Sequence, residues 1–131
     1  MKKAIRIKLT ESEQLGKQLA KTLQGGEILA LIGPLGAGKT TFTKSLAKHL
    51  GIKHKINSPT FTLLHRFPLK LHRRKLLLYH LDLYRTKNFR EAKTLGLDEF
   101  WGQPDAITVI EWADKIKKHL PSKTQPIFFS H

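Results

Sequence analysis

Residues 33–41 read GPLGAGKTT and follow the apolar run ILALI at 28–32. The spacing Gly33-x4-Gly38-Lys39-Thr40 is that of a phosphate-binding loop between a buried strand and a helix, and this context argues against a chance glycine turn. Glycines allow the positive φ values that turn backbone N–H groups toward a phosphate, and the helix N-terminus adds positive dipole. Lys39 supplies a charge at the β and γ phosphates, and the Thr40 hydroxyl is placed for Mg²⁺. The predicted phosphate-binding residues are Gly33, Leu35, Gly36, Ala37, Gly38, Lys39, Thr40 and Thr41.

Two carboxylates are expected at the ends of strands. Glu111 closes the apolar run ITVI, and Asp82 lies near the end of the strand-like segment KLLLYHLDLYR at 75–85. A Mg²⁺–nucleotide site needs an oxygen ligand and a group that orients the attacking water. Asp82 and Glu111 are therefore the candidate catalytic residues, with a surface pair or a helix cap as the alternative.

Other candidates are less specific. Thr60 in NSPTFT follows the loop helix, where nucleotide switches place a threonine near the γ-phosphate, although Ser58-Pro59 also fits an ordinary turn. Strand alternation puts His80, Asp82 and Tyr84 on one face. His80, Tyr84 and Trp112 are as consistent with the core as with the site. The Asn-Lys-x-Asp signature of guanine-binding switches is absent, which favours ATP.

The remaining elements must position these groups. A strand is expected at 4–9, a helix before Gly25-Gly26, and a helix from the loop to Leu50. A hairpin follows, with strands at 61–67 and 75–85 and PLKLHRR between them. A short helix at 88–96, a strand at 106–112, a helix at 114–120 and a brief strand PIFF complete the chain. This order predicts one α/β domain over residues 1–131, a three-layer sandwich with a largely parallel sheet and an antiparallel hairpin, whose ligands bind at the carboxyl ends of the strands.

The composition of the chain excludes several kinds of functional site. The chain of 131 residues has no cysteine, which excludes disulfides, thiolate zinc sites and a cysteine nucleophile. No apolar run is long enough for a membrane span and the N-terminus lacks a signal-like core, so a cytoplasmic location is expected. The formal net charge is +14, and no carboxylate occurs between Glu27 and Asp82. This charge is consistent with simple solubility or with contact to nucleic acid or an acidic protein.

The motifs GPLGAGKTT, SPTFT, YHLDLYR, LGLDEFW and VIEW occur in an order and spacing that resemble the TsaE (YjeE) family. The resemblance covers roughly residues 5–115. It implies a P-loop NTPase-like α/β fold and a weak, partner-coupled Mg²⁺-dependent ATPase that acts with TsaD and TsaB in N6-threonylcarbamoyladenosine (t6A) synthesis on tRNA.

The resemblance also implies roles for individual residues. Lys39 would bind ATP phosphates, Thr40 and Glu111 would serve Mg²⁺, and Asp82 would be needed for hydrolysis. Thr60 would be the switch threonine, and backbone near Thr10 would approach the adenine.

The sequence departs from the family pattern in two places. Family members extend further at the C-terminus, with additional strands. Truncation after PIFFSH is therefore one explanation for the shorter C-terminal end of this sequence. The hairpin turn PLKLHRRK is also more basic than the family pattern leads us to expect, which leaves a local RNA or partner contact open.

Two alternatives to the ATPase interpretation remain at this point. A small-molecule kinase would use the same loop but would need an acceptor pocket and an arginine-rich lid, and the Arg-dense stretch Arg73-Arg74 falls in the predicted hairpin turn. A nucleotide-gated RNA-binding module would fit the charge, but the Asp82 and Glu111 pair argues against it.

Overall fold

The computed structural model describes residues 1–34, 37–53 and 64–131. Its strands are β1 (Ile5–Lys8), β2 (Ile28–Ile32), β3 (Leu64–Leu71), β4 (Arg74–Asp82), β5 (Ala106–Glu111) and β6 (Gln125–Ser130). Its α-helices are α1 (Ser12–Ala20), α2 (Ala37–His49), α3 (Phe89–Lys93) and α4 (Leu97–Phe100). Two 3-10 segments are η1 (Leu9–Glu11) and η2 (Ala113–His119).

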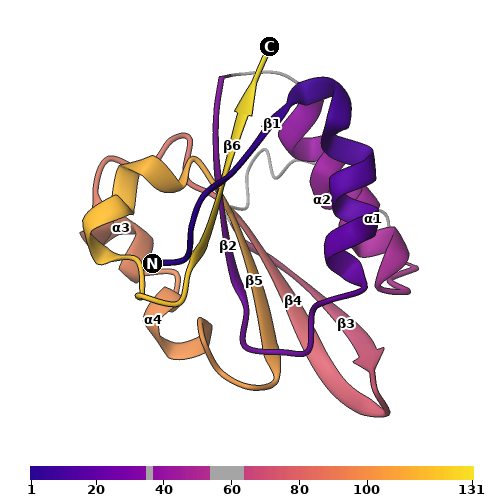
Figure 1. Cartoon of the computed structure of the whole chain (residues 1–131). Helices are drawn as coiled ribbons and strands as arrows, with labels where there is room; N and C mark the ends of the chain where they lie inside the picture. Colours follow the sequence, from indigo (N-terminus) through magenta and orange to yellow (C-terminus); the bar gives the residue numbers. More distant parts are fainter. Residues whose placement is uncertain (35–36, 54–63) are drawn as a thin grey trace.

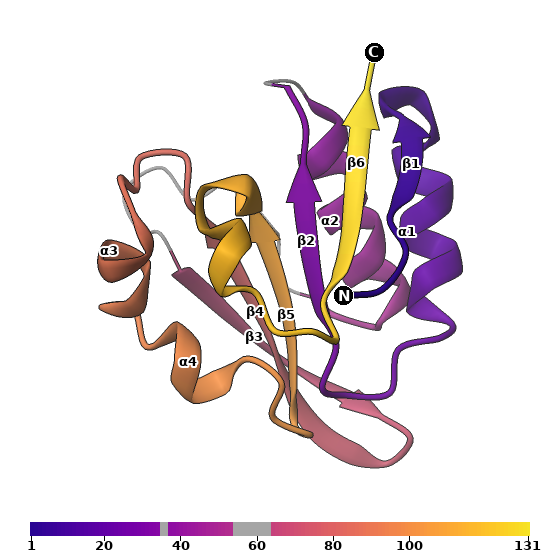
Figure 2. The ribbon, with the colours of Figure 1, turned by 60° about the vertical axis from the view of Figure 1, so that its left-hand side comes forward.

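The strands form one six-stranded sheet in the order β1-β6-β2-β5-β4-β3. Every neighbouring pair is parallel except β3 and β4, which form an antiparallel hairpin. Helices α1 and α2 cover one face, and α3, α4 and η2 cover the other, as Figure 1 and Figure 2 show. The predicted α/β sandwich with a largely parallel sheet is therefore confirmed.

The central strands are apolar because both of their faces are covered. All six residues of β5 are buried, as are the first four of β2. One core lies under α1 and α2, where the rings of Phe42 and Phe129 meet edge to face with centroids 5.8 Å apart. The second core, under α3, α4 and η2, includes the stacked rings of Tyr79 and Phe100. A parallel sheet covered in this way exposes its strand ends, where a ligand can bind.

The hairpin differs from the prediction. β3 continues through Leu71, and Leu71 pairs with Arg74 across a two-residue turn at His72 and Arg73. The expected turn PLKLHRR is thus mostly strand, because Phe67 and Leu69 are buried while Pro68 and Lys70 are exposed, the alternation of a half-buried strand. Pro68 is tolerated since β3 lies at the edge of the described sheet.

Other predicted elements also shift. The helix expected at 88–96 is the shorter α3, and a second helix that the sequence did not predict, α4, begins after Gly96, whose φ is 83°. The segment expected as a helix at 114–120 is the 3-10 segment η2. The strand predicted at PIFF extends over Gln125–Ser130 and pairs with both β1 and β2. None of the helices in the described ranges has the length and apolarity to cross a membrane.

Candidate functional site

The glycine-rich loop joins the carboxyl end of β2 to the amino end of α2, as the pattern predicts. A Cβ on Gly33 would lie 2.7 Å from the carbonyl oxygen of Phe129 in β6, and one on Gly38 would lie 2.1 Å from Leu9 Cδ2. The contact at Gly33 is with backbone, so no side chain fits there, whereas at Gly38 the nearest atom is the end of the Leu9 side chain, which would have to move. Glycine at these two positions is thus explained by packing against β6 and η1. Leu35 and Gly36 lie outside the described residues.

Lys39 lies beneath the loop and is only 2% exposed. Its Nζ donates a hydrogen bond to the Gly33 carbonyl oxygen at 2.9 Å and lies 3.6 Å from the centroid of the Trp112 ring. Burial lowers the pKa of Lys39, and the charges of Glu111, Asp82 and Asp114 oppose this shift. The lysine predicted to bind phosphate is thus electrostatically coupled to both predicted catalytic carboxylates.

Glu111 ends β5 and is 4% exposed. Its Oε2 accepts a hydrogen bond from His80 Nε2 at 2.6 Å, and His80 in β4 is completely buried. The two residues share the face of the sheet toward α1 and α2, since Val109 is the register partner of His80 and precedes Glu111 by two. The contact holds the carboxylate in one orientation at the strand end.

Asp82 is the last residue of β4 and the register partner of Glu111. Its Oδ1 accepts a hydrogen bond from the backbone N–H of Tyr84 at 3.0 Å. Burial raises the pKa of Asp82 and Glu111 adds to the rise, while the Tyr84 hydrogen bond and the charges of His80 and Lys39 oppose it. The prediction that Asp82 and Glu111 lie at strand ends is confirmed, and the structure adds that the two residues are register partners.

The predicted threonines have different positions. Thr40 and Thr41 lie in the first turn of α2, beside Lys39. Thr10 is exposed in η1, the segment whose Leu9 packs against Gly38, so it lies next to the loop. Thr60 lies outside the described residues and its predicted role stays a prediction.

The segment after β4 is joined to η2. Lys115 Nζ donates to the carbonyl oxygens of Tyr84 and Thr86, the second at 3.1 Å. The rings of Tyr84 and Trp112 lie 5.1 Å apart. Tyr84 is outside β4 and 46% exposed, so the prediction that it shares a strand face with His80 and Asp82 is wrong. These contacts bring the motifs YHLDLYR and VIEW together at the site.

Sequence reasoning left two residues of this site undecided. His80 lies two positions before Asp82 in the alternating strand, which was a usable signal for its place beside Glu111. Trp112 has a φ of 59°, a left-handed conformation that turns the chain just after β5. Nothing in the residue pattern predicts this conformation, so the contact of its ring with Lys39 could not be foreseen.

Comparison with known proteins accounts for the motifs. The family model "Threonylcarbamoyl adenosine biosynthesis protein TsaE" matches residues 7–131. The chain belongs to the TsaE family. The family resemblance drawn from the motifs is thus confirmed.

Several TsaE relatives are similar over most of the chain, and each is named tRNA threonylcarbamoyladenosine biosynthesis protein TsaE. The relative from Bacillus subtilis is 42% identical over 86% of this chain and 67% of its own length. The relative from Synechocystis is 41% identical over 88% of this chain and 71% of its own length. The relative from Treponema pallidum is 36% identical over 89% of this chain and 82% of its own length.

The fold is also similar to a solved structure of a TsaE relative. The crystal structure of Bacillus subtilis YdiB matches 93% of this chain and 71% of that chain, with 36% sequence identity and a TM-score of 0.64. The six-stranded arrangement described above is therefore a fold found in this family.

Proposed function

We propose that this TsaE-family chain binds and slowly hydrolyses ATP as a subunit of the machinery that makes N6-threonylcarbamoyladenosine in tRNA. The observation that carries the proposal is geometric: Asp82 and Glu111 are register partners at two neighbouring strand ends, and the Lys39 Nζ lies 3.6 Å from the ring of Trp112, the residue after Glu111. The names of the relatives from three bacteria supply the pathway. We place this activity in the cytoplasm and expect TsaD and TsaB to be its partners.

We assign the binding of the nucleotide phosphates to the glycine-rich loop. Backbone N–H groups at the start of α2 and the Lys39 ammonium would bind the β and γ phosphates. The start of α2 directly after the loop that follows β2, with the buried Lys39 in its first turn, supports this assignment. We assign contact with the γ-phosphate to Thr60. We assign contact with the adenine to the backbone near Thr10.

We assign the binding of Mg²⁺ to Thr40 and Glu111. The described residues contain no cluster of three His, Asp or Glu side chains that could hold a metal by themselves. A hydroxyl and a carboxylate that share a cation with nucleotide phosphates fit Mg²⁺, which is usually bound through one or two protein oxygens. Bound Mg²⁺ would neutralise charge on the phosphate oxygens. His80 holds Glu111 in place through their 2.6 Å contact, and Asp82 is assigned the orientation of the attacking water.

The site favours an ATPase over a small-molecule kinase. A kinase lid would need arginines over the phosphates. Arg73 and Arg74 instead lie at the hairpin turn, at the end of β4 opposite Asp82. The Arg74 guanidinium donates to the carbonyl oxygens of Gln24 and Pro104, so it fastens the hairpin to two loops at that end of the sheet.

The test has two parts. Incubation with Mg²⁺–ATP and a panel of metabolites should release free phosphate slowly and phosphorylate no metabolite; a phosphorylated product would identify a kinase. Reconstitution with TsaC, TsaD, TsaB, threonine, bicarbonate, ATP and tRNA should give multiple rounds of modification only when this chain is added. Equal modification without it, or with Glu111→Ala in its place, would overturn the proposal.

A further inference from the structure

The far end of the β3–β4 hairpin is strongly basic, although it is remote from the nucleotide site. Lys70, Arg73 and Lys75 are exposed at that end, and Arg66 is exposed further along β3, opposite Tyr79; we call these four residues the hairpin basic patch. Within the ranges that the structure describes, none of the four has an ion-pair partner. Arg74 is excluded from the patch because its guanidinium is bonded to Gln24 and Pro104.

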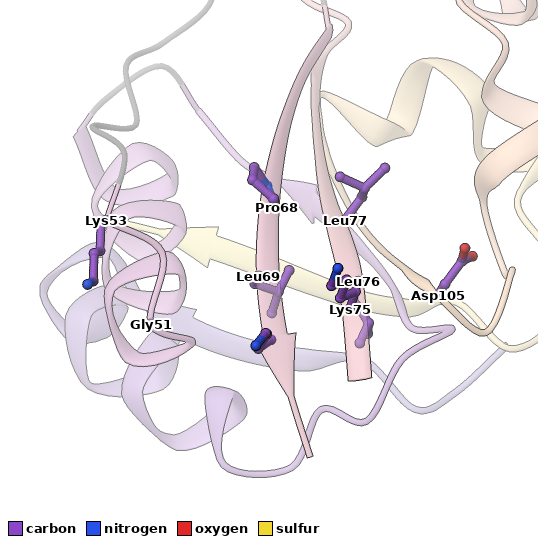
Figure 3. Close-up of a pocket in the computed structure, with 9 residues that line it drawn as sticks. Gly51, Lys53, Pro68, Leu69, Lys75, Leu76, Leu77 and Asp105 are labelled. Carbon is purple, nitrogen blue, oxygen red and sulfur yellow. The ribbon is translucent and has the colours of Figure 1, made fainter. Parts of the chain in front are cut away.

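A hollow of about 680 Å³ lies at the base of this patch, as Figure 3 shows. Its cations come from two places in the chain: Lys53 follows α2, and Lys70 and Lys75 are register partners on β3 and β4. Its apolar lining includes Pro68 and Leu77, which are register partners two residues further along the same face. Asp105 is the one carboxylate in the lining among the described residues.

The order of side chains along this face is informative. Arg66, Pro68 and Lys70 alternate along one face of β3, so an apolar pair, Pro68 and Leu77, lies between cations on both sides. A nucleotide has the same combination, an anionic phosphate next to a flat, largely apolar base. Binding of single-stranded nucleic acid commonly joins a cationic groove with aromatic side chains on which bases stack, and here Pro68 and Leu77 offer an aliphatic surface in that place.

The turn itself is strained. His72 and Arg73 have φ values of 52° and 65°, and a two-residue hairpin turn with both central residues at positive φ is normally filled by Asn-Gly or a similar pair. Non-glycine residues at such positions are typical of sites where a side chain is needed for function. His72 and Arg73 are both exposed at this turn.

Protection of the sheet edge explains only part of this pattern. β3 is an edge strand, and natural edges carry lysine and proline to prevent pairing with other chains. That purpose would account for Pro68 and Lys70. It does not account for the positive φ values of His72 and Arg73 in the turn.

We propose that the hairpin basic patch and the hollow beside it bind single-stranded RNA, with phosphates on Lys70, Lys75 and Arg73 and a base against Pro68 and Leu77. This contact goes beyond the proposed ATPase activity and does not depend on it, because Lys70, Arg73 and Lys75 lie at the opposite end of β4 from Asp82. The net charge of +14 favours the same partner.

The test uses a fluorescein-labelled single-stranded RNA and the full chain without nucleotide, with anisotropy measured over a series of salt concentrations. Each lost phosphate contact on a single strand reduces the log–log salt slope by about 0.7. Lys70→Gln with Lys75→Gln should therefore reduce the slope by about 1.4. The matched control is Lys117→Gln with Lys118→Gln on η2, two exposed lysines whose loss changes net charge equally and should leave the slope as in the wild type.

A second variant separates binding from folding. His72→Asn with Arg73→Gly supplies the residues that the turn prefers, so it should raise the Tm while weakening RNA binding. The affinity for Mg²⁺–ATP should stay unchanged in every hairpin variant. ATP binding and RNA binding therefore test the two proposals independently, and either proposal can fail without the other. Equal RNA binding by wild type and hairpin variants, or equal loss in the control, would overturn the inference. Displacement of the RNA by polyglutamate at an equal concentration of charges would assign the patch to an acidic protein instead.

Discussion

The Lys39 ammonium lies 3.6 Å from the centroid of the Trp112 ring, and its Nζ donates to the Gly33 carbonyl oxygen at 2.9 Å. One side chain thereby joins the glycine-rich loop to the residue that follows Glu111. The loop and the end of β5 are mechanically connected through this lysine, so a change at either should be sensed at the other.

Lys39→Ala should remove most of the affinity for Mg²⁺–ATP. The ammonium is the only side-chain cation of the described loop residues, and hydrogen bonds to charged groups contribute about 1.5–3 kcal/mol each. Calorimetric titration measures the loss. The control is Lys48→Ala, an exposed lysine in the last turn of α2, which should bind as the wild type does. Near-native affinity of Lys39→Ala would show that the nucleotide binds elsewhere.

Asp82→Asn should abolish most hydrolysis and leave nucleotide binding intact. The carboxylate is assigned to the attacking water, while the loop supplies the affinity for the ground state. Asn keeps an oxygen that can accept the Tyr84 N–H, so the local fold should survive. Phosphate release and calorimetry measure the two effects, and a wild-type rate would disprove the assignment.

The same variant should change how stability depends on pH. Because burial raises the pKa of Asp82, the folded protein takes up a proton more readily than the unfolded chain does. The carboxyl therefore stabilises the fold below the unfolded pKa of about 3.9 and loses this contribution as pH rises through the higher folded pKa. We expect the Tm of Asp82→Asn to exceed that of the wild type near neutral pH, by a margin that shrinks toward acid. A margin that grows on acidification would contradict the direction of the pKa shift.

His80→Leu should lower the hydrolysis rate more than the nucleotide affinity. It removes the donor 2.6 Å from Glu111 Oε2, so the carboxylate is no longer held at the strand end. His80→Gln keeps an N–H donor and should recover part of the rate. Steady-state hydrolysis with separate binding titrations checks both variants. If Gln and Leu give the same rate, the hydrogen bond has no positioning role.

Gly33→Ala should destabilise the protein and weaken nucleotide binding together. The new Cβ would lie 2.7 Å from the Phe129 carbonyl oxygen, and overpacking of this kind costs about 1–3 kcal/mol. Gly51→Ala is the comparison, because a Cβ there meets nothing within 4 Å and the cost comes only from its positive φ of 82°. It should lower the free energy of unfolding without affecting nucleotide affinity. Urea titrations and calorimetry separate the two cases.

The sequence predicts this molecule well wherever a local pattern decides the structure. Strand β2, the loop and α2 follow from apolar runs and glycine spacing, and period-2 alternation places His80 and Asp82 on one face. The extent of β3 was missed, because Pro68 signals a turn unless the strand is known to be an edge. Strand order is a matter of pairing between distant segments, so nothing local showed that β6 lies between β1 and β2.

The position of β6 has a consequence for how the protein is made. Strand β6 (residues 125–130) lies between β1 and β2, which both belong to the first 32 residues. This part of the sheet therefore pairs segments that are far apart in the sequence. Such non-local pairing slows folding. During synthesis, β1 and the edge of β2 that does not face β5 lack their partner until residues 125–130 have been made, and Phe129, against which Gly33 packs, is made with them. We therefore expect that a nascent chain lacking β6 does not yet bind nucleotide.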